Sequence, residues 1–342
     1  MQMKRILVAL LWIAIFCLIT VGIHYFDRPG KTLYQSAVVF PVMSTQASLN
    51  FTDTSEEEIE QAFRLAREEM EKVVGICNYF DPQSELSRLN ATAAEKPFVC
   101  SAALWEILQE VRKFHELSNG AFDPTIRPLM QVWGFHRKRR TLPDEKEIAQ
   151  AKSLCGFDKI VFNDADHSVF FKIPGLSIDL GGIAKGWAVD KAAEAVLKYT
   201  SVRTGIIDLG GNMRCLPEPP PGKSSYTIAV RDPKNPDGIC ALVEVLNECV
   251  ATSGNYERYV TINGKQYTHI INPVTGHPVE GVLSATVITP RGVDSDALST
   301  SLFVNGARFA KQLGPDTRTL FITADGTKTE QIPKGRKGFQ MQ

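Results

Sequence analysis

A carboxylate and a hydroxyl lie four residues apart in the segment 294–300, which reads DSDALST. In a helix, this spacing puts the side-chain oxygens of Asp296 and Thr300 on one face. Such oxygens suit a hard cation such as Mg²⁺, which keeps its remaining positions for water and substrate phosphate. Simple capping of a helix by Asp294 or Ser295 is the alternative, and spacing alone favours it. Spacing alone therefore leaves a metal site and a cap as alternatives.

A glycine-rich turn offers a second kind of chemistry, anion binding. Residues 179–186 read DLGGIAKG, so an apolar run leads into two glycines, then Lys185, then the start of a helix. Glycines allow a ligand close to the backbone, and a helix N-terminus favours negative charge. The sequence matches neither GxxxxGK[ST] nor GxGxxG. A tight turn between a strand and a helix is the alternative, as it is for the second glycine pair, Gly210-Gly211.

His269 is a candidate proton acceptor, because it stands at the end of an expected strand just before the turn-like Asn272-Pro273. Imidazole is the side chain that changes charge nearest neutral pH. A structural histidine held by hydrogen bonds is the alternative at this position.

The elements that must position these residues are helices mixed with hairpins. Period-3.6 patterns predict helices over residues 59–74, 101–114, 144–152 and 186–199, the first with a capping box at Ser55–Glu58. Strand patterns cover residues 38–51, 160–162, 169–173, 206–207, 226–230, 241–246, 259–262 and 285–288, and Asn263-Gly264 is a hairpin turn. Without regular βαβ alternation, this order predicts an α+β fold with antiparallel sheets.

Composition excludes several classes of protein. The chain has 342 residues with 38 basic and 38 acidic side chains, and 44% of its residues are hydrophobic. This balance argues against a disordered chain and against a dedicated nucleic-acid binder. Six cysteines follow Cys17 and none forms a CxxC pair, so buried free thiols or one or two disulfides are expected rather than a metal cluster.

The N-terminus is expected to lie outside the fold. Residues 6–23 carry no charge and are just long enough to span the hydrocarbon of a bilayer. We interpret residues 1–30 as an uncleaved membrane anchor, with a cleaved signal or a buried helix as alternatives, and residues 24–36 as a tether. Lys4 and Arg5 on the cytoplasmic side would put the domain, residues 36–335, outside the cytoplasm.

Taken together, these segments resemble one family, the FAD:protein FMN transferases or ApbE family. The resemblance covers about residues 38–325, and the signposts occur in the family's order. They are Met43-Ser44-Thr45, Asp81–Asn90, Gly120–Thr125, Trp133-Gly134-Phe135, Asp179–Gly186, Gly210-Gly211-Asn212, Ala251–Gly254, His269–Gly276 and Asp296–Thr300.

The resemblance implies a T-fold-like body that holds FAD in a cleft, cleaves its pyrophosphate, passes FMN to a threonine of a target protein and releases AMP. The side chains implied to line the FAD site are Met43, Phe80, Ala121, Phe122, Asp123, Asp179, Lys185, Val279 and Ser299. Mg²⁺ is implied at Asp296, Thr300 and the carbonyl of Gly182, and His269 matches the family's general base.

The same resemblance implies a partner and a location. The acceptor would be a subunit of a membrane redox complex with an Asp-Gly-x-Thr-type segment, and the enzyme would face the periplasm from the bacterial inner membrane. Hydrolysis of FAD to FMN and AMP, or flavin carriage without catalysis, are the alternatives. Three departures from the family pattern stand out: Ser44 replaces a glycine, Phe80 replaces a tyrosine, and Asn272 replaces an aspartate.

Overall fold

A large antiparallel sheet forms the centre of the protein, as seen in a computed structural model that describes residues 26–28, 31–135, 139–235 and 237–342. Its nine strands follow the order β1-β2-β3-β7-β8-β11-β14-β15-β16, and every neighbouring pair is antiparallel. In that order their bounds are Phe26–Arg28, Lys31–Val42, Thr45–Asp53, Thr204–Leu209, Asn212–Cys215, Cys249–Gly254, Val282–Thr289, Arg318–Thr323 and Lys328–Gln331.

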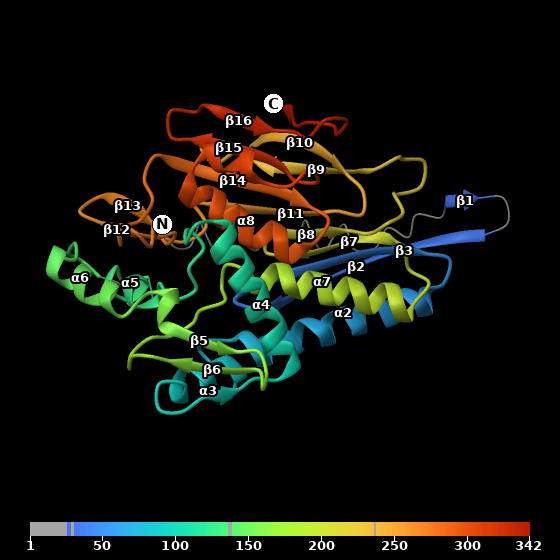
Figure 1. Cartoon of the computed structure of the whole chain (residues 1–342). Coiled ribbons are helices and arrows are strands. Elements are labelled where there is room, and N and C mark those ends of the chain that lie inside the picture. The colour runs from blue at the N-terminus through green and yellow to red at the C-terminus, as the bar shows by residue number, and fades with distance from the viewer. Residues whose placement is uncertain (1–25, 29–30, 136–138, 236) are drawn as a thin grey trace, which may run out of the picture.

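Helices cover one face of this sheet (Figure 1). Three of them, α2 (Glu56–Cys77), α7 (Ala184–Tyr199) and α8 (Gly292–Asn305), lie side by side along it, and α4 (Ala102–Leu117) packs against them. Their apolar faces and the facing strand residues form the main hydrophobic core. The site candidates on α7 and α8 are therefore carried by elements that the core holds in place.

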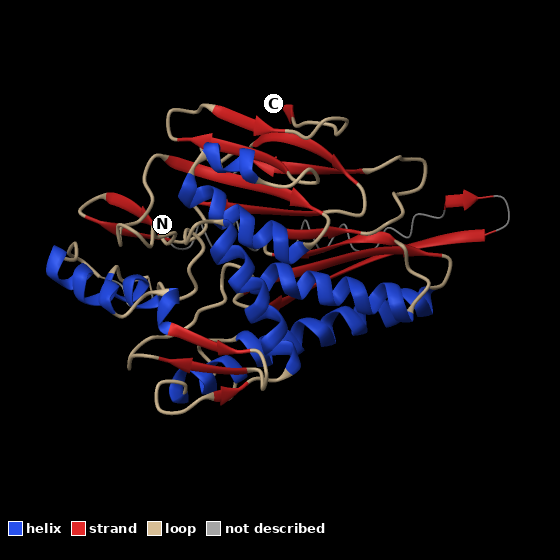
Figure 2. Cartoon of the chain, in the orientation of Figure 1, coloured by secondary structure: helices blue, strands red, loops and turns tan. Residues whose placement is uncertain are grey.

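A small sheet covers the opposite face. It has the order β17-β10-β9, with bounds Gln340–Met341, Ile239–Val245 and Tyr226–Arg231. Along β9, buried and exposed residues alternate, as expected of a strand with one face in a core. Its buried side chains pack on Val250 and Ile288 of the large sheet. The result is a layered α+β fold with antiparallel sheets, as predicted (Figure 2).

The remaining elements lie at the edge of these layers. They are α3 (Glu85–Thr92), α5 (Arg127–Val132), α6 (Glu145–Ser153), the 3₁₀ turns Phe157–Lys159 and Ala307–Gln312, the sheet β4-β6-β5 (Phe98–Val99, Ser168–Phe171, Ile160–Asn163) and the hairpin β12-β13 (Tyr259–Ile262, Lys265–Thr268). A separate apolar cluster joins α5, α6 and Tyr267 of β13. This cluster supports the loop that carries His269.

Most helix predictions are confirmed, with local corrections. The capping box at Ser55 is incomplete: its hydroxyl accepts from Glu58 N at 3.2 Å, but the Glu58 carboxylate accepts from Ser201 N at 2.6 Å instead. The expected strand at 38–51 is a hairpin, in which Met43 and Ser44 form the turn between β2 and β3. The six cysteines after Cys17 are free and buried.

The predicted N-terminal anchor, residues 1–30, lies almost wholly outside the described residues. The expected tether at 24–36 is wrong in its described part, because β1 pairs there with the start of β2. Among the described helices, none has the length and apolar character needed to cross a membrane.

Two glycines set the distance between α7 and α8. A Cβ built on Gly186 would lie 2.1 Å from the carbonyl oxygen of Gly292, and one built on Gly292 would lie 2.5 Å from the carbonyl oxygen of Gly186. Real atoms cannot approach backbone so closely, so the two helix backbones touch only because both positions lack a side chain.

Gly186→Ala should therefore lower the free energy of unfolding by about 3 kcal/mol or more, because overpacking against rigid backbone cannot relax easily. The matched control is Gly75→Ala in α2, where nothing lies within 4 Å of the added Cβ. Alanine there should raise the free energy of unfolding by about 0.5–1 kcal/mol. Urea unfolding of both variants measures the difference, and equal effects would contradict the crossing described above.

Candidate active site

The two touching helices exchange hydrogen bonds between a carboxylate and backbone. On α8, Asp296 Oδ2 accepts from Gly186 N of α7 at 2.8 Å. On α7, the Asp190 carboxylate accepts from Gly292 N at 2.7 Å and from Val293 N at 2.9 Å. Each helix thus caps the first turn of the other, which fixes Asp296 against the glycine-rich turn.

Neither Asp294 nor Ser295 caps α8. The Asp294 carboxylate instead lies 3.1 Å from Lys113 Nζ, and Ser295 Oγ donates to the Gly292 carbonyl at 2.9 Å. The capping interpretation of this segment is therefore wrong, and the α8 N-terminus depends on Asp190.

Hydroxyl oxygens gather beside Asp296. Ser253 Oγ of β11 lies 2.8 Å from Ser299 Oγ and 3.3 Å from Thr300 Oγ1. A Cβ built on Gly182 would lie 3.5 Å from Thr300 Oγ1, so the glycine-rich turn borders the same cluster. The backbone of Gly182 and the hydroxyls of Ser299 and Thr300 thus lie close together, and their role as metal and ligand contacts stays a prediction.

This donor set fits Mg²⁺, which prefers carboxylate, hydroxyl, carbonyl and water oxygens. Within the described ranges there is no group of three or more His, Cys, Asp or Glu side chains that could hold a metal. Asp296 would therefore be the charged protein ligand, and further negative charge would have to come from the substrate.

Lys185 and Asn212 complete the charge arrangement around Asp296. Lys185 Nζ lies 3.6 Å from Asp296 Oδ1. When the buried Asn212 amide is oriented to satisfy both neighbours, its nitrogen donates to Asp296 Oδ1 at 3.1 Å and its oxygen accepts from Lys185 Nζ at 3.0 Å. The second glycine pair, which precedes Asn212, thus places an amide that holds the ammonium beside the carboxylate.

Asp179 is held in an ion pair at the other end of the turn. Its Oδ2 lies 2.8 Å from Arg127 Nη1, and its Oδ1 accepts from Gly181 N at 2.8 Å. The buried Arg127 guanidinium lies 3.3 Å from the ring centroid of Tyr79 and 4.8 Å from that of Phe80. Phe80 is 61% exposed, so this stack presents an aromatic ring at the surface next to Asp179.

Among the other predicted FAD-site residues, Phe122 packs against the turn, while Ala121 and Asp123 lie beside Phe122 in sequence. The ring of Phe122 is buried, and its Cε2 lies 3.3 Å from a Cβ built on Gly182, so it underlies the turn rather than standing open to a ligand. Ala121 beside it is buried too. Asp123 Oδ1 accepts from Thr125 N at 2.8 Å and from Thr125 Oγ1 at 2.6 Å, and burial raises the pKa of its carboxyl.

Two predicted residues lie on separate loops. Val279 is half-buried, and its N–H donates to the carbonyl of Ile270, the residue after His269, at 2.9 Å. Met43 lies in the β2–β3 turn, where Thr45 contacts Gly210. No contact joins Met43 directly to the oxygen cluster among the described interactions.

His269 is neutral at pH 7. Burial, together with the positive charges of Arg258 and Lys185, lowers the pKa of its imidazole to about 4, and the hydrogen bond to the Arg258 carbonyl and the charge of Asp179 oppose this shift only in part. The charges of Lys185 and Asp179, both in the glycine-rich turn, therefore act on the imidazole of His269. His269 Nδ1 lies 3.0 Å from the Arg258 carbonyl oxygen, which can only accept, so Nδ1 carries the proton and Nε2 keeps its lone pair.

Two of the three departures from the family pattern have a local structural role. Asn272 Oδ1 accepts from Val274 N at 2.9 Å, so it holds the following turn and does not touch His269. Ser44 has φ +59°, a left-handed conformation that glycine adopts without strain, which explains why glycine suits this position.

Sequence reasoning missed three residues of the site. Arg127 and Asp190 are charged residues within apolar stretches, which is a signal that each has a partner in the core. Asn90, in the predicted motif 81–90, has a structural role: its amide donates to the Ile178 carbonyl and accepts from Ile178 N, both at 2.8 Å. It thereby fixes the irregular segment that enters the glycine-rich turn.

Comparison with known proteins identifies the family of this chain. A sequence model of the ApbE family matches residues 43–320. The FAD:protein FMN transferase of Treponema pallidum is 33% identical over 284 residues, 78% of this chain and 77% of that protein. The FAD:protein FMN transferase of Haemophilus influenzae is 31% identical over 299 residues, 85% of each chain.

The fold agrees as well. The crystal structure of the ApbE protein from Thermotoga maritima superposes with a TM-score of 0.79 and 29% sequence identity, covering 88% of this chain and 97% of that one. The chain described here therefore belongs to the ApbE family.

Proposed function

We propose that this chain is a transferase that moves FMN from FAD to a threonine hydroxyl of a target protein and releases AMP. The observation that carries the proposal is the combination of three features. These are the oxygen cluster around Asp296, the ammonium of Lys185, and the neutral imidazole of His269. Transfer of a phosphoryl group between two oxygens needs charge neutralisation, alignment and a proton acceptor.

The glycine-rich turn would bind the pyrophosphate of FAD. Lys185 supplies a positive charge at the start of α7, where the helix dipole also favours an anion. The exposed ring of Phe80 could pack against a ring of the ligand, and the Arg127–Asp179 pair would fix the edge of the cleft.

Asp296, Thr300 and the carbonyl of Gly182 would hold Mg²⁺ beside this pyrophosphate. When bound, the ion would neutralise charge on the phosphates and polarise the phosphorus–oxygen bond to be broken. Asn212 would keep Lys185 next to Asp296. The Lys185 ammonium and the ion held by Asp296 would then both neutralise charge on the pyrophosphate.

His269 would take the proton of the acceptor threonine through Nε2. The threonine oxygen forms a bond to the phosphorus of FMN, the phosphorus–oxygen bond to AMP breaks, and AMP leaves with the electron pair. Because a pKa of about 4 makes His269 a weak base, we expect its contribution at the low end of the usual range.

Transfer is tested by incubating the full chain in mild detergent with FAD, Mg²⁺ and an acceptor domain carrying an Asp-Gly-x-Thr-type segment. Intact-mass measurement should show one FMN added to the acceptor, and chelation of Mg²⁺ should prevent it. Asp296→Ala should reduce the rate by at least about 100-fold through loss of charge stabilisation. Asp294→Ala, two residues away on the same helix, should leave the rate within about twofold.

Three outcomes would contradict this proposal. Free FMN and AMP with an unmodified acceptor would indicate a hydrolase. FAD that stays bound and intact would indicate a carrier. Equal rates for Asp296→Ala and the wild type would exclude the metal assignment.

We further infer that residues 1–30 anchor the enzyme in the bacterial inner membrane with its domain in the periplasm. The uncharged run of residues 6–23 after Lys4 and Arg5 supports this inference. The T-fold-like description of the domain likewise stays a prediction. In cells, the same acceptor should gain FMN only when it carries an export signal, and flavinylation of a cytoplasmic copy alone would contradict the inference.

The pH profile tests the role of His269. The group accepts a proton only while neutral, and its pKa lies near 4 in the free protein. The value of kcat/KM should therefore stay level from pH 7 to about 5 and fall as the pH drops through about 4. His269→Asn should lower kcat by about 100-fold and remove this acid limb, because asparagine can still donate to the Arg258 carbonyl but offers no base.

His277→Asn is the matched control, since His277 lies in the same loop and its partly exposed side chain faces Glu145. Its rate and acid limb should match those of the wild type. An unchanged acid limb in His269→Asn would show that another group takes the proton.

A further inference from the structure

We propose that Asp190 is a positioning residue for the metal site and acts through the N-terminus of α8. The inference rests on the proposed function only where it treats this metal site as the catalytic site. Asp190 lies on α7 and touches neither Asp296 nor Thr300 in any described contact. Its carboxylate binds the first two N–H groups of the helix that carries both residues.

The helix has no cap of its own. Its N-cap residue, Arg291, makes no side-chain hydrogen bond to the first turn. Gly292 and Val293 are buried against α7, where water cannot easily replace a missing partner. Unpaired N–H groups at a buried helix start are costly, so the Asp190 carboxylate is the group that makes this close crossing possible.

The geometry links this cap to the metal ligands. Asp296 follows Val293 by three residues and Thr300 lies one turn further, so both move with the start of a rigid helix. Asp296 in turn binds Gly186 N, four residues before Asp190 on α7. Asp190 and Asp296 therefore close a ring of contacts around Gly186 and Gly292, and loosening one side shifts the other.

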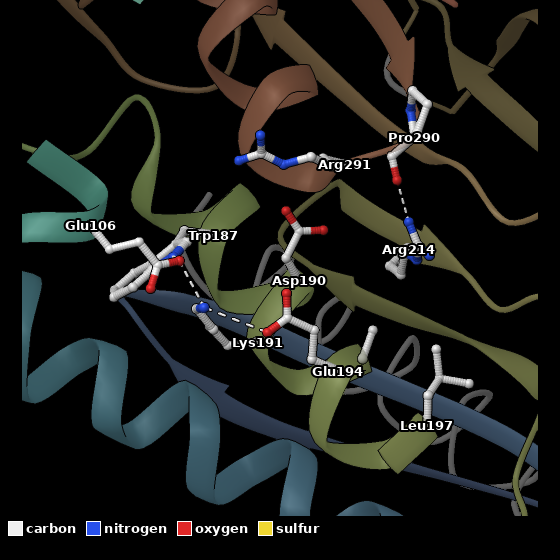
Figure 3. A pocket seen from close by; sticks show the side chains of 10 residues that line it. Glu106, Trp187, Asp190, Lys191, Glu194, Leu197, Arg214, Pro290 and Arg291 are labelled. Carbon is white, nitrogen blue, oxygen red and sulfur yellow. Dashed lines mark hydrogen bonds and ion pairs between the residues drawn. The ribbon is translucent and has the colours of Figure 1, made fainter. Parts of the chain in front are cut away.

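The surroundings of Asp190 partly stabilise its carboxylate. Asp190 lines a pocket of about 200 Å³ between α7 and the strand that carries Arg214 (Figure 3). Cys249 Sγ lies 3.7 Å from Asp190 Oδ1. Burial raises the pKa of the Asp190 carboxyl, and the hydrogen bonds from Val293 N and Gly292 N and the charges of Arg214 and Arg291 oppose this rise. Charged partners thus offset part of the cost of desolvating this half-buried carboxylate.

Mn²⁺ binding to the full chain in mild detergent tests the proposal without any turnover. The EPR signal of free Mn²⁺ reports the dissociation constant, and Asp296→Ala identifies the site. Asp190→Asn keeps one acceptor oxygen but sets an NH₂ group against the second N–H. It should weaken Mn²⁺ binding on the order of tenfold, a size typical of groups that orient metal ligands.

Asp294→Asn is the matched control, because it removes the same charge from the same end of α8 without touching Gly292 N or Val293 N. Its Mn²⁺ affinity should stay within about twofold of the wild type. The rate of FMN transfer at saturating Mn²⁺ should recover in Asp190→Asn to within about threefold of the wild type, which a general loss of structure would not allow.

A second variant separates positioning from simple unfolding. Arg291→Ser supplies a hydroxyl cap from the helix's own N-cap position. In the double variant Asp190→Asn/Arg291→Ser, the Mn²⁺ affinity should lie within about threefold of that of Arg291→Ser alone. This comparison can still be made if Asp190→Asn alone does not fold.

The proposal is overturned if folded Asp190→Asn binds Mn²⁺ like the wild type, if Asp294→Asn weakens binding equally, or if Arg291→Ser brings no recovery. A wild-type chain that binds Mn²⁺ at Asp296 but transfers no FMN would contradict the proposed function and leave this inference standing.

Discussion

The contact between the backbones of Gly186 and Gly292 is the constraint on which the site depends. It lets α7 and α8 cross so closely that a carboxylate from each reaches the first turn of the other. The same crossing brings the glycine-rich turn at the start of α7 beside Thr300. Packing of both helices on the large sheet then fixes this pair relative to Ser253 of β11.

The charges that result explain why the site suits a pyrophosphate. One carboxylate, Asp296, faces the ammonium of Lys185, and the other nearby donors are neutral oxygens. With one carboxylate, the protein neutralises only part of the charge of a divalent ion, so an anionic substrate can supply the rest. The metal ion would complete its coordination with phosphate oxygens. His269 adds a proton acceptor that stays neutral at pH 7 without adding charge of its own.

Patterns among residues close in sequence predicted much of the fold, but they did not predict contacts between residues far apart in the chain. The helix after Ser101 and the turn at Asn263-Gly264 follow from caps, periodicity and turn chemistry close in sequence. The position of Asp296 and Thr300 one turn apart on a helix follows from their spacing, whereas their role in metal binding rests on family resemblance and stays a prediction. The cap by Asp190, the bridge by Asn212 and the burial of Phe122 under Gly182 depend on residues from about 30 to 100 positions apart, so periodicity carried no sign of them.

The most direct test of this account is a crystal structure of the full chain with FAD and Mn²⁺, in which anomalous scattering locates the metal. The account predicts one peak bounded by the Asp296 carboxylate, the Thr300 hydroxyl and the Gly182 carbonyl, with the pyrophosphate of FAD against it and Lys185. A bound FAD with its metal held by other residues, or with no metal at Asp296, would contradict it.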